Sequence, residues 1–330
     1  MPKNNVNPDD SARKSVFRAG PYGDMAAERM YTVNRFLRET FGRKMIKLAI
    51  DGGFTCPTRD GTKGTGGCLF CGSGAGGDFA GSIDSQIRLL EKKWPDAGYL
   101  AYFQNHTNTY APVPVLRQKY EAALSDPRIR GIVIATRPDC LPDDVLDLLS
   151  EIRETHFLWV ELGLQTAHDS TAERIGRGFP LSVYRNALRD LTSRGIRTVT
   201  HLINGLPGES HKMMRESARF VADSGSWGIK LHLLNVVRGS RLAEEQPDYV
   251  PFSSIDEYVS LTCDIIEELP QDMVIHRLTA DAPRKILIAP EWSYKKRTIL
   301  NGINHELRRR GTYQGYRREH TGTIEITPET

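Results

Sequence analysis

The chain has 330 residues, of which 39% are hydrophobic, and its formal net charge at pH 7 is only +3. This length is enough to bury the core of one barrel-sized domain, while the small net charge excludes a uniformly basic nucleic-acid binder. No apolar run is long enough to span a bilayer, and the polar first ten residues lack a signal-peptide core, so we expect a cytoplasmic protein with no membrane partner.

Short apolar and β-branched runs alternate with amphipathic stretches along most of the chain. The runs predict six strands, at Met45–Ile50, Tyr99–Phe103, Ile132–Ala135, Leu158–Leu162, Arg197–Ile203 and Ile229–Leu234. The stretches predict six helices, at Ser82–Lys93, Val115–Ser125, Pro142–Thr155, Leu181–Arg194, His211–Ala222 and Ser254–Leu269. Six strand–helix units in this order predict an α/β fold with a parallel sheet, curled into a partial (β/α)6 TIM-like barrel shorter than the eight-unit form.

This barrel is predicted to span residues 44–270. Residues 1–43 are expected to form an N-terminal arm and a helix at Ala26–Phe41, and residues 271–330 a basic C-terminal extension packed on the barrel. In such barrels the reacting groups lie at the C-terminal ends of the strands. The polar motifs of this sequence all follow the predicted strands, so we expect them to gather at one end of the barrel.

Three of the five cysteines, Cys56, Cys68 and Cys71, follow the first predicted strand in a glycine-rich loop. Three thiolates can hold three irons of a cubane iron–sulfur cluster and leave the fourth iron open to a small ligand. A structural zinc site normally closes with four ligands, and the nearest candidate for the fourth, His106, lies beyond a predicted helix. The cysteine count thus favours a cluster in a reducing compartment, and a zinc-bound RNA-binding module without catalysis is the alternative from another class.

Several motifs extend this pattern beyond the cysteines. They are Phe54–Pro57, Arg59–Thr62, Gly66–Cys71, Gln104, Thr107–Tyr110, Thr136–Asp139, Glu161–Gln165, Arg177–Gly178, His201–Glu209 and Ile288–Pro290. Together they resemble the radical S-adenosylmethionine (SAM) enzymes, in the branch with a lengthened first cysteine interval that includes the catalytic subunit of the elongator complex. The stand-alone bacterial proteins of the YhcC/YtqA type are the most similar group, and the resemblance runs from about residue 31 to residue 316.

The resemblance implies two cofactors, SAM and one [4Fe-4S] cluster held by Cys56, Cys68 and Cys71, and a reductant such as flavodoxin or ferredoxin. Around SAM it implies Thr107 and Asn108 at the methionyl end, Glu161 and Gln165 at the ribose, and Phe70 with Asn204, Leu206 and Pro207 at the adenine, with Arg137 and Arg177 nearby. The 136–139 motif also suits a simple strand exit, and the 205–208 motif a tight turn.

Two residues are candidates for chemistry on the substrate. Cys140, just beyond the third strand, could supply hydrogen or a thiyl radical, although a buried free cysteine without any role is common. Lys230, on the sixth strand, is the second candidate. No second cluster is expected, because only two cysteines remain outside the loop.

The C-terminal extension interleaves basic and aromatic residues, a composition that suits phosphate contacts and base stacking. Its candidate RNA-binding residues are Lys295, Lys296, Arg297, Arg308, Arg309 and Arg310, although a solvated helix face explains these charges almost as well. The resemblance implies tRNA as the partner and its wobble uridine, substituted at the 5-position, as the target. The chain ends at Thr330, so no acetyl-CoA domain is expected, and a radical SAM enzyme acting on a small metabolite or peptide is the alternative.

Overall fold

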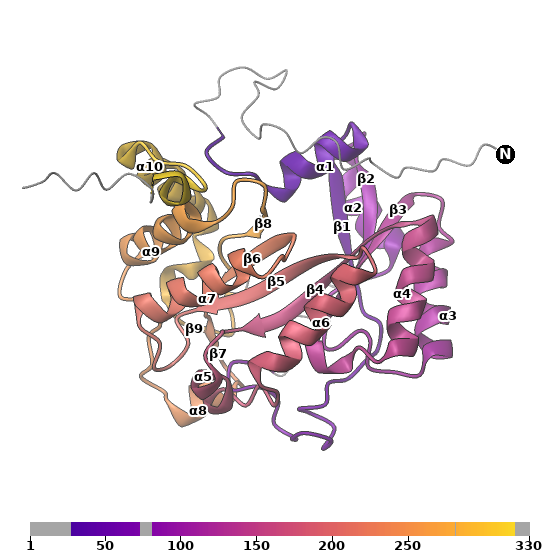
Figure 1. Ribbon diagram of the computed structural model, residues 1–330, viewed down its shortest axis with the longest axis horizontal. Helices are drawn as coiled ribbons and strands as arrows, with labels where there is room; N and C mark the ends of the chain where they lie inside the picture. The colour runs from indigo at the N-terminus through magenta and orange to yellow at the C-terminus, as the bar shows by residue number, and fades with distance from the viewer. Residues whose placement is uncertain (1–27, 73–80, 281, 321–330) are drawn as a thin grey trace, which may run out of the picture.

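The computed structural model describes residues 28–72, 81–280 and 282–320. Seven parallel strands form a single curled sheet in chain order, with helices around its outside (Figure 1). The strands are β1 (Met45–Ile50), β2 (Gly98–Phe103), β3 (Ile129–Thr136), β4 (Phe157–Gln165), β5 (Arg197–Asn204), β6 (Gly228–Leu233) and β8 (Val274–Arg277). All six predicted strands are confirmed. The fold is the expected partial barrel, and β8 adds a seventh strand from beyond residue 270.

The helices that follow the strands cover the outer face of the sheet. They are α2 (Ile83–Glu91), α3 (Val113–Leu124), α4 (Asp143–Thr155), α6 (Leu181–Ser193), α7 (His211–Asp223) and α9 (Ile255–Glu268). Outward-facing strand residues such as Leu48, Ile134, Leu162 and Leu231 form the main hydrophobic core with these helices. Because both faces of the strands are buried, the strands read as nearly continuous apolar runs, which is why the sequence located them well.

Helix α1 (Val33–Phe41) closes the N-terminal end of the half-barrel. Its Leu37 packs in a second hydrophobic cluster with inward-facing strand residues, among them Leu100 and Trp159. The predicted start at Ala26 is wrong, because the helix begins after Thr32, whose side chain caps it by accepting a hydrogen bond from the Arg35 backbone N–H. The predicted arm lies mostly in residues 1–27, outside the described residues.

The opposite end carries the loops that leave the strands, with two short helices, α5 (Asp169–Arg174) and α8 (Arg241–Glu245) (Figure 1). A small antiparallel sheet of β7 (Val236–Val237) and β9 (Leu287–Ala289) lies with them. A 3-10 turn, η4 (Glu291–Tyr294), leads from β9 into α10 (Lys296–Arg310), and α11 (Tyr316–His320) follows. Helix α10 buries Ile299, Ile303 and Leu307 along one face, and it packs on α9. None of the described helices is long and apolar enough to cross a bilayer.

Candidate active site

The three loop cysteines lie directly beyond the C-terminal end of β1. Cys68 is held by a contact from its Sγ to the Gly176 carbonyl oxygen at 3.7 Å. Burial raises the pKa of Cys68 to about 11, and the neighbouring Cys71 and Cys56 thiols add to this shift. Within the described residues no three His, Cys, Asp or Glu side chains are grouped as ligands of one metal ion. Three thiols are one fewer than the four ligands that normally close a structural zinc site, whereas a three-thiol set suits a cubane cluster with one open iron.

A short ionic chain ties the cysteine loop to the ends of β3 and β4. Lys63 Nζ lies 2.6 Å from the Asp139 carboxylate, which also accepts two hydrogen bonds from Arg137, at 2.8 and 2.9 Å. Arg137 in turn donates to the Arg177 carbonyl oxygen at 2.8 Å. Burial opposes the charge on Arg137, but Asp139 and the nearby Cys56 and Cys68 sulfurs hold the pKa of this guanidinium above its ordinary value. The strand-exit motif therefore places a fixed positive charge beside the thiols.

Two polar side chains in the loop after β2 are buried, and each has an oxygen atom that could form a further hydrogen bond. Thr107 and Asn108 are both 0% exposed, and the Thr107 Oγ1 and Asn108 Oδ1 atoms have no partner within the part of the chain that the structure describes. The Thr107 N–H donates to the Thr55 carbonyl oxygen at 3.2 Å, next to Cys56. Buried polar atoms are rarely left without a partner. A polar cofactor bound beside the cysteines fits these two atoms.

The residues predicted at the adenine also come together. Leu206 is fully buried in a small apolar cluster with Leu69 of the cysteine loop, and Phe70 packs against the same cluster. The turn after β5 is fixed by two hydrogen bonds, from Arg174 to the Pro207 carbonyl oxygen and from the Tyr249 hydroxyl to the Gly205 carbonyl oxygen. Asn204, at the end of β5, is 1% exposed. These contacts join the turn to the cysteine loop.

Gln165 ends β4 at an irregularity in the pairing with β5. Its φ of 69° lies in the left-handed region, which is uncommon for a residue other than glycine. Such a conformation points the chain away from the sheet at the level of the other site loops.

Glu161 and Lys230 lie deeper in the barrel, at mid-strand, and they contact each other. The Glu161 carboxylate accepts hydrogen bonds from Lys230 Nζ and from the Tyr102 hydroxyl, the latter at 2.6 Å. His201 Nε2 lies 3.0 Å from it and Lys47 Nζ 3.4 Å. The two predicted site residues thus belong to a buried ionic cluster, which we call the barrel-core cluster (Lys47, Tyr102, Glu161, His201 and Lys230).

The charges of this cluster follow from its partners. Burial by itself would raise the pKa of Glu161, but Lys230 and Lys47 hold it well below its ordinary value. Burial lowers the pKa of Lys230 while Glu161 raises it. We take Lys230 as charged, because its Nζ contacts both the carboxylate and the Tyr102 oxygen. Burial and the Lys230 charge lower the pKa of His201 to about 4, so this imidazole is neutral at pH 7.

Acid is expected to destabilise the fold through His201. Its pKa is about 4 in the folded protein against an ordinary 6.5, so the unfolded chain binds the extra proton first and stability falls as pH drops from 6.5 toward 4. The slope from one such histidine reaches about 1.4 kcal/mol per pH unit. Urea unfolding of wild type and His201→Asn between pH 7 and 4.5 measures this. We expect a shallower decline in the variant, and equal slopes would contradict the assignment.

Arg177 is a structural clamp for the loop after β4. It is 1% exposed, and its guanidinium donates to the carbonyl oxygens of Leu164, Thr166 and Phe179 at 2.7 to 3.0 Å and to Asp169 at 3.0 Å. With these partners the side chain itself is fully engaged. The contact of Arg177 with a cofactor stays a prediction, and these partners give the side chain a structural role that also fixes the Arg177 carbonyl oxygen bound by Arg137.

Replacing Arg177 by methionine is expected to lower the free energy of unfolding by on the order of 3 kcal/mol or more, because each buried carbonyl left without a donor costs about 1 to 3 kcal/mol. Urea denaturation measures the loss. The matched control is Arg189→Met, because Arg189 is an exposed arginine whose one ion pair within the described residues is with Asp190. Equal losses in the two variants would contradict the clamp.

Sequence comparisons agree with this geometry. The family model described as the radical SAM superfamily matches residues 61–221, and the radical SAM C-terminal domain matches residues 226–309. The chain is 47% identical over 304 residues to the uncharacterized protein YtqA of Bacillus subtilis, covering 89% of this chain and 94% of that one. This protein belongs to the radical SAM superfamily. Protein YhcC of Escherichia coli is 38% identical over 291 residues, covering 84% of this chain and 93% of that relative.

Two more distant similarities are to a tRNA uridine(34) acetyltransferase and to a solved structure of Elp3. Over 171 residues the chain is 29% identical to the tRNA uridine(34) acetyltransferase of Dehalococcoides mccartyi, covering 49% of this chain and 36% of that one. Among solved structures, the Elp3 of Methanocaldococcus infernus superposes with a TM-score of 0.62 at 15% identity, covering 86% of this chain and 68% of that one. The second likeness confirms the predicted fold. Membership of the superfamily implies SAM and an iron–sulfur cluster as the cofactors of this radical SAM protein.

Cys140, a predicted catalytic residue of this radical SAM protein, is 6% exposed and lies in the turn after β3, η3 (Pro138–Cys140). Burial, and then the neighbouring Asp139, raises the pKa of its thiol to about 12. The group therefore remains a thiol at neutral pH, the form that can give up a hydrogen atom, and it is a poor nucleophile.

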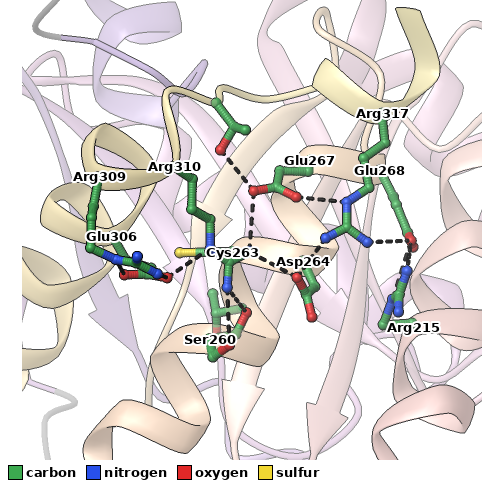
Figure 2. Close-up of polar contacts among 12 residues, drawn as sticks. Arg215, Ser260, Cys263, Asp264, Glu267, Glu268, Glu306, Arg309, Arg310 and Arg317 are labelled. Atoms are coloured by element: carbon green, nitrogen blue, oxygen red, sulfur yellow. Dashed lines mark hydrogen bonds and ion pairs between the residues drawn. The ribbon is translucent and has the colours of Figure 1, made fainter. Parts of the chain in front are cut away.

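The basic residues predicted to bind RNA separate into two groups. Arg310 donates to Asp264 at 2.8 Å, to Glu306 at 2.7 Å and to Glu267 at 3.2 Å, and Arg309 makes two hydrogen bonds to Glu306 (Figure 2). These two arginines lie in an acidic surrounding on α9 and α10. Lys295, Arg297 and Arg308 are exposed, Arg309 is exposed but paired with Glu306, and Lys296 is half-buried.

Sequence reasoning missed two members of the barrel-core cluster, Lys47 and Tyr102. Both occupy inward-facing positions of their strands, on the same face of the sheet as Glu161, His201 and Lys230. A polar residue at an inward position of an otherwise apolar strand needs a partner. Reading the strands at period two would therefore have marked each of these residues as an inward polar side chain that needs a partner, without saying which partner.

Proposed function

We propose that this radical SAM enzyme holds one [4Fe-4S] cluster on Cys56, Cys68 and Cys71 and modifies the wobble uridine of tRNA at its 5-position. When bound, such a cluster supplies the electron that cleaves SAM into methionine and a 5'-deoxyadenosyl radical, which abstracts a hydrogen atom from the substrate. The residues of the chain bind and orient these groups.

The arrangement of the cofactor residues supports this proposal. The unpartnered Thr107 Oγ1 and Asn108 Oδ1 suit the amine and carboxylate of methionine. Phe70 and Leu206 offer an apolar surface to adenine, and Gln165 is available to the ribose. The Glu161 carboxylate already accepts hydrogen bonds from Lys230 and Tyr102. Glu161 therefore has a positioning role, because it holds these two side chains in place beneath the cofactor.

The tRNA part of the proposal is carried by one observation, the similarity to a tRNA uridine(34) acetyltransferase over 171 residues. The matched part is 36% of that relative, so the proposal extends to the base and not to the acetyl group. Exposed cations on and before α10, Lys295, Arg297 and Arg308, give this surface the charge that a phosphate backbone needs. Arg309 and Arg310 contribute less, because carboxylates already neutralise them.

The test is anaerobic reconstitution with iron and sulfide, reduction in the presence of SAM, and assay of 5'-deoxyadenosine with and without bulk tRNA. We expect tRNA to raise the yield, and nucleoside mass spectrometry of the recovered tRNA to show a mass change on uridine. Deoxyadenosine formation that is indifferent to tRNA, with no change in its nucleosides, would contradict the substrate and favour a small metabolite or peptide.

A further inference from the structure

A hollow of about 450 Å³ opens beside the small β7–β9 sheet. It is lined by Arg284, Leu287, Glu291, Trp292, Tyr294 and Lys295. Its volume lies within the range of about 300 to 1,000 Å³ that small-molecule sites occupy. The lining combines aromatic, cationic and acidic side chains, so the ligand that fits it is itself both flat and polar.

An exposed aromatic ring forms one side of this hollow. Tyr294 is 43% exposed, the Arg284 guanidinium lies 4.4 Å from the centre of its ring, and Lys295 Nζ lies 6.0 Å from it. A guanidinium stacked on a tyrosine extends the flat surface on which a nucleobase can stack. Neither Arg284 nor Lys295 has a carboxylate partner among residues 28–72, 81–280 and 282–320, so both positive charges are available to an anion.

The acidic side chain in the lining, Glu291, limits which ligands the hollow can bind. A site for a bare phosphate gains nothing from Glu291, because a carboxylate repels an anion. A carboxylate does accept hydrogen bonds from the amino or imino groups on the edge of a base. Trp292, which also lines the hollow, carries an indole N–H that can donate a hydrogen bond. A ligand that has a flat base, a phosphate and a hydrogen-bonding edge on the base is a nucleotide.

We propose that this hollow binds one unpaired nucleotide of the RNA substrate, with the base stacked on Tyr294 and Arg284 and a phosphate beside Lys295. The inference rests on the proposed function, which it deepens by assigning a recognition site separate from the reacting base. Nothing in the cofactor site is needed for it.

The fold connects the hollow to the reacting end of the barrel. Strand β9, which precedes η4, pairs with β7, and the Arg238 N–H donates to the Ile286 carbonyl oxygen at 2.8 Å. Ala289 of β9 and Val236 of β7 belong to the same apolar cluster as Leu69 of the cysteine loop. A nucleotide held in the hollow is therefore carried by the structural unit that supports the cysteines, as recognition of a base near the modified one requires.

The experiment measures binding of bulk tRNA to the cluster-loaded protein by fluorescence anisotropy at fixed salt. Tyr294→Ala is expected to weaken binding about 10-fold or more, because base–aromatic stacking has an effect of this size, while Tyr294→Phe keeps the ring and stays near wild type. Lys295→Ala should reduce the slope of log K against log salt by about one. The matched control is Trp94→Ala, an exposed aromatic with Lys44 at 4.3 Å from its ring, just before β2 at the opposite end of the sheet.

The outcomes separate the two proposals. Wild-type affinity in Tyr294→Ala, with deoxyadenosine still raised by tRNA, overturns the hollow and leaves the proposed function intact. A wild-type protein that neither binds tRNA nor responds to it overturns both. Equal weakening in Tyr294→Ala and Trp94→Ala also overturns the hollow.

A second measurement does not depend on the folding of any variant. Wild-type protein is irradiated with tRNA that contains 4-thiouridine, and the digested peptides are analysed by mass spectrometry. We expect a nucleotide attached within residues 284–295. Cross-links confined to other segments contradict the site.

Discussion

Cys68→Ala is expected to abolish both the brown colour of the reconstituted protein and the formation of 5'-deoxyadenosine. Cys68 is partly buried in the loop, and it contacts the Gly176 carbonyl oxygen through Sγ. With two thiolates the loop can no longer hold a cubane cluster whose fourth iron is open to SAM. We expect most of the iron to be lost and turnover to fall by at least about 10³-fold, since the electron that cleaves SAM would come from the cluster.

The matched control for this loss is Cys263→Ala. Cys263 is 0% exposed within α9, in the main hydrophobic core, and it lies outside the cysteine loop. The variant should keep wild-type iron content and deoxyadenosine yield with only a small loss of stability. Ultraviolet–visible absorbance, iron analysis and chromatography of deoxyadenosine give the three readouts. SAM cleavage retained by Cys68→Ala would falsify the cluster assignment.

Most strands and helices of the fold could be predicted from the sequence because the signals for them are local. The runs around Leu48, Leu162 and Leu231 are apolar on both faces, and the helices between them are amphipathic. The seventh strand, β8, was missed because Val274–Arg277 is short and two of its four residues, His276 and Arg277, are polar. Helix α1 was predicted to begin too early, because the sequence signal for its end at Gly42 is stronger than the signal for its start at Thr32.

The site divides in the same way. Cys56, Cys68 and Cys71 were predicted because their spacing is a local pattern with a chemical meaning. The partners of Glu161 could not be predicted from spacing, because Tyr102, His201 and Lys230 come from three other strands and meet only when the register of the sheet is known. Likewise the acidic surrounding of Arg310 depends on how α10 lies against α9, so a basic composition overstated the positive charge of that surface.

The second large effect that we expect is a loss of stability when the barrel-core cluster is disrupted. Glu161→Gln is expected to lower the free energy of unfolding by about 3 to 5 kcal/mol, because it leaves the buried Lys230 ammonium without an opposite charge. Lys230→Met should cost less, since the Glu161 carboxylate keeps Lys47 at 3.4 Å and His201 at 3.0 Å. Lys230 has no such second carboxylate within the described residues. Urea denaturation at pH 7 measures both losses.

The double variant, Glu161→Gln with Lys230→Met, separates pairing from packing. If the two groups stabilise the barrel as a pair, the double variant loses less stability than the sum of the single losses, because removing both charges leaves neither one unpaired in the core. An exposed pair supplies the control: Arg35 and Glu39 lie 2.8 Å apart on α1, and Glu39→Gln should change the free energy of unfolding by only about 0 to 1 kcal/mol. A loss for Glu161→Gln no larger than that of Glu39→Gln would show that Lys230 is uncharged in the folded barrel. Its amine would then be free for chemistry on the substrate, as predicted from the sequence without a stated role, whereas a large loss assigns Lys230 to the structural support beneath the site.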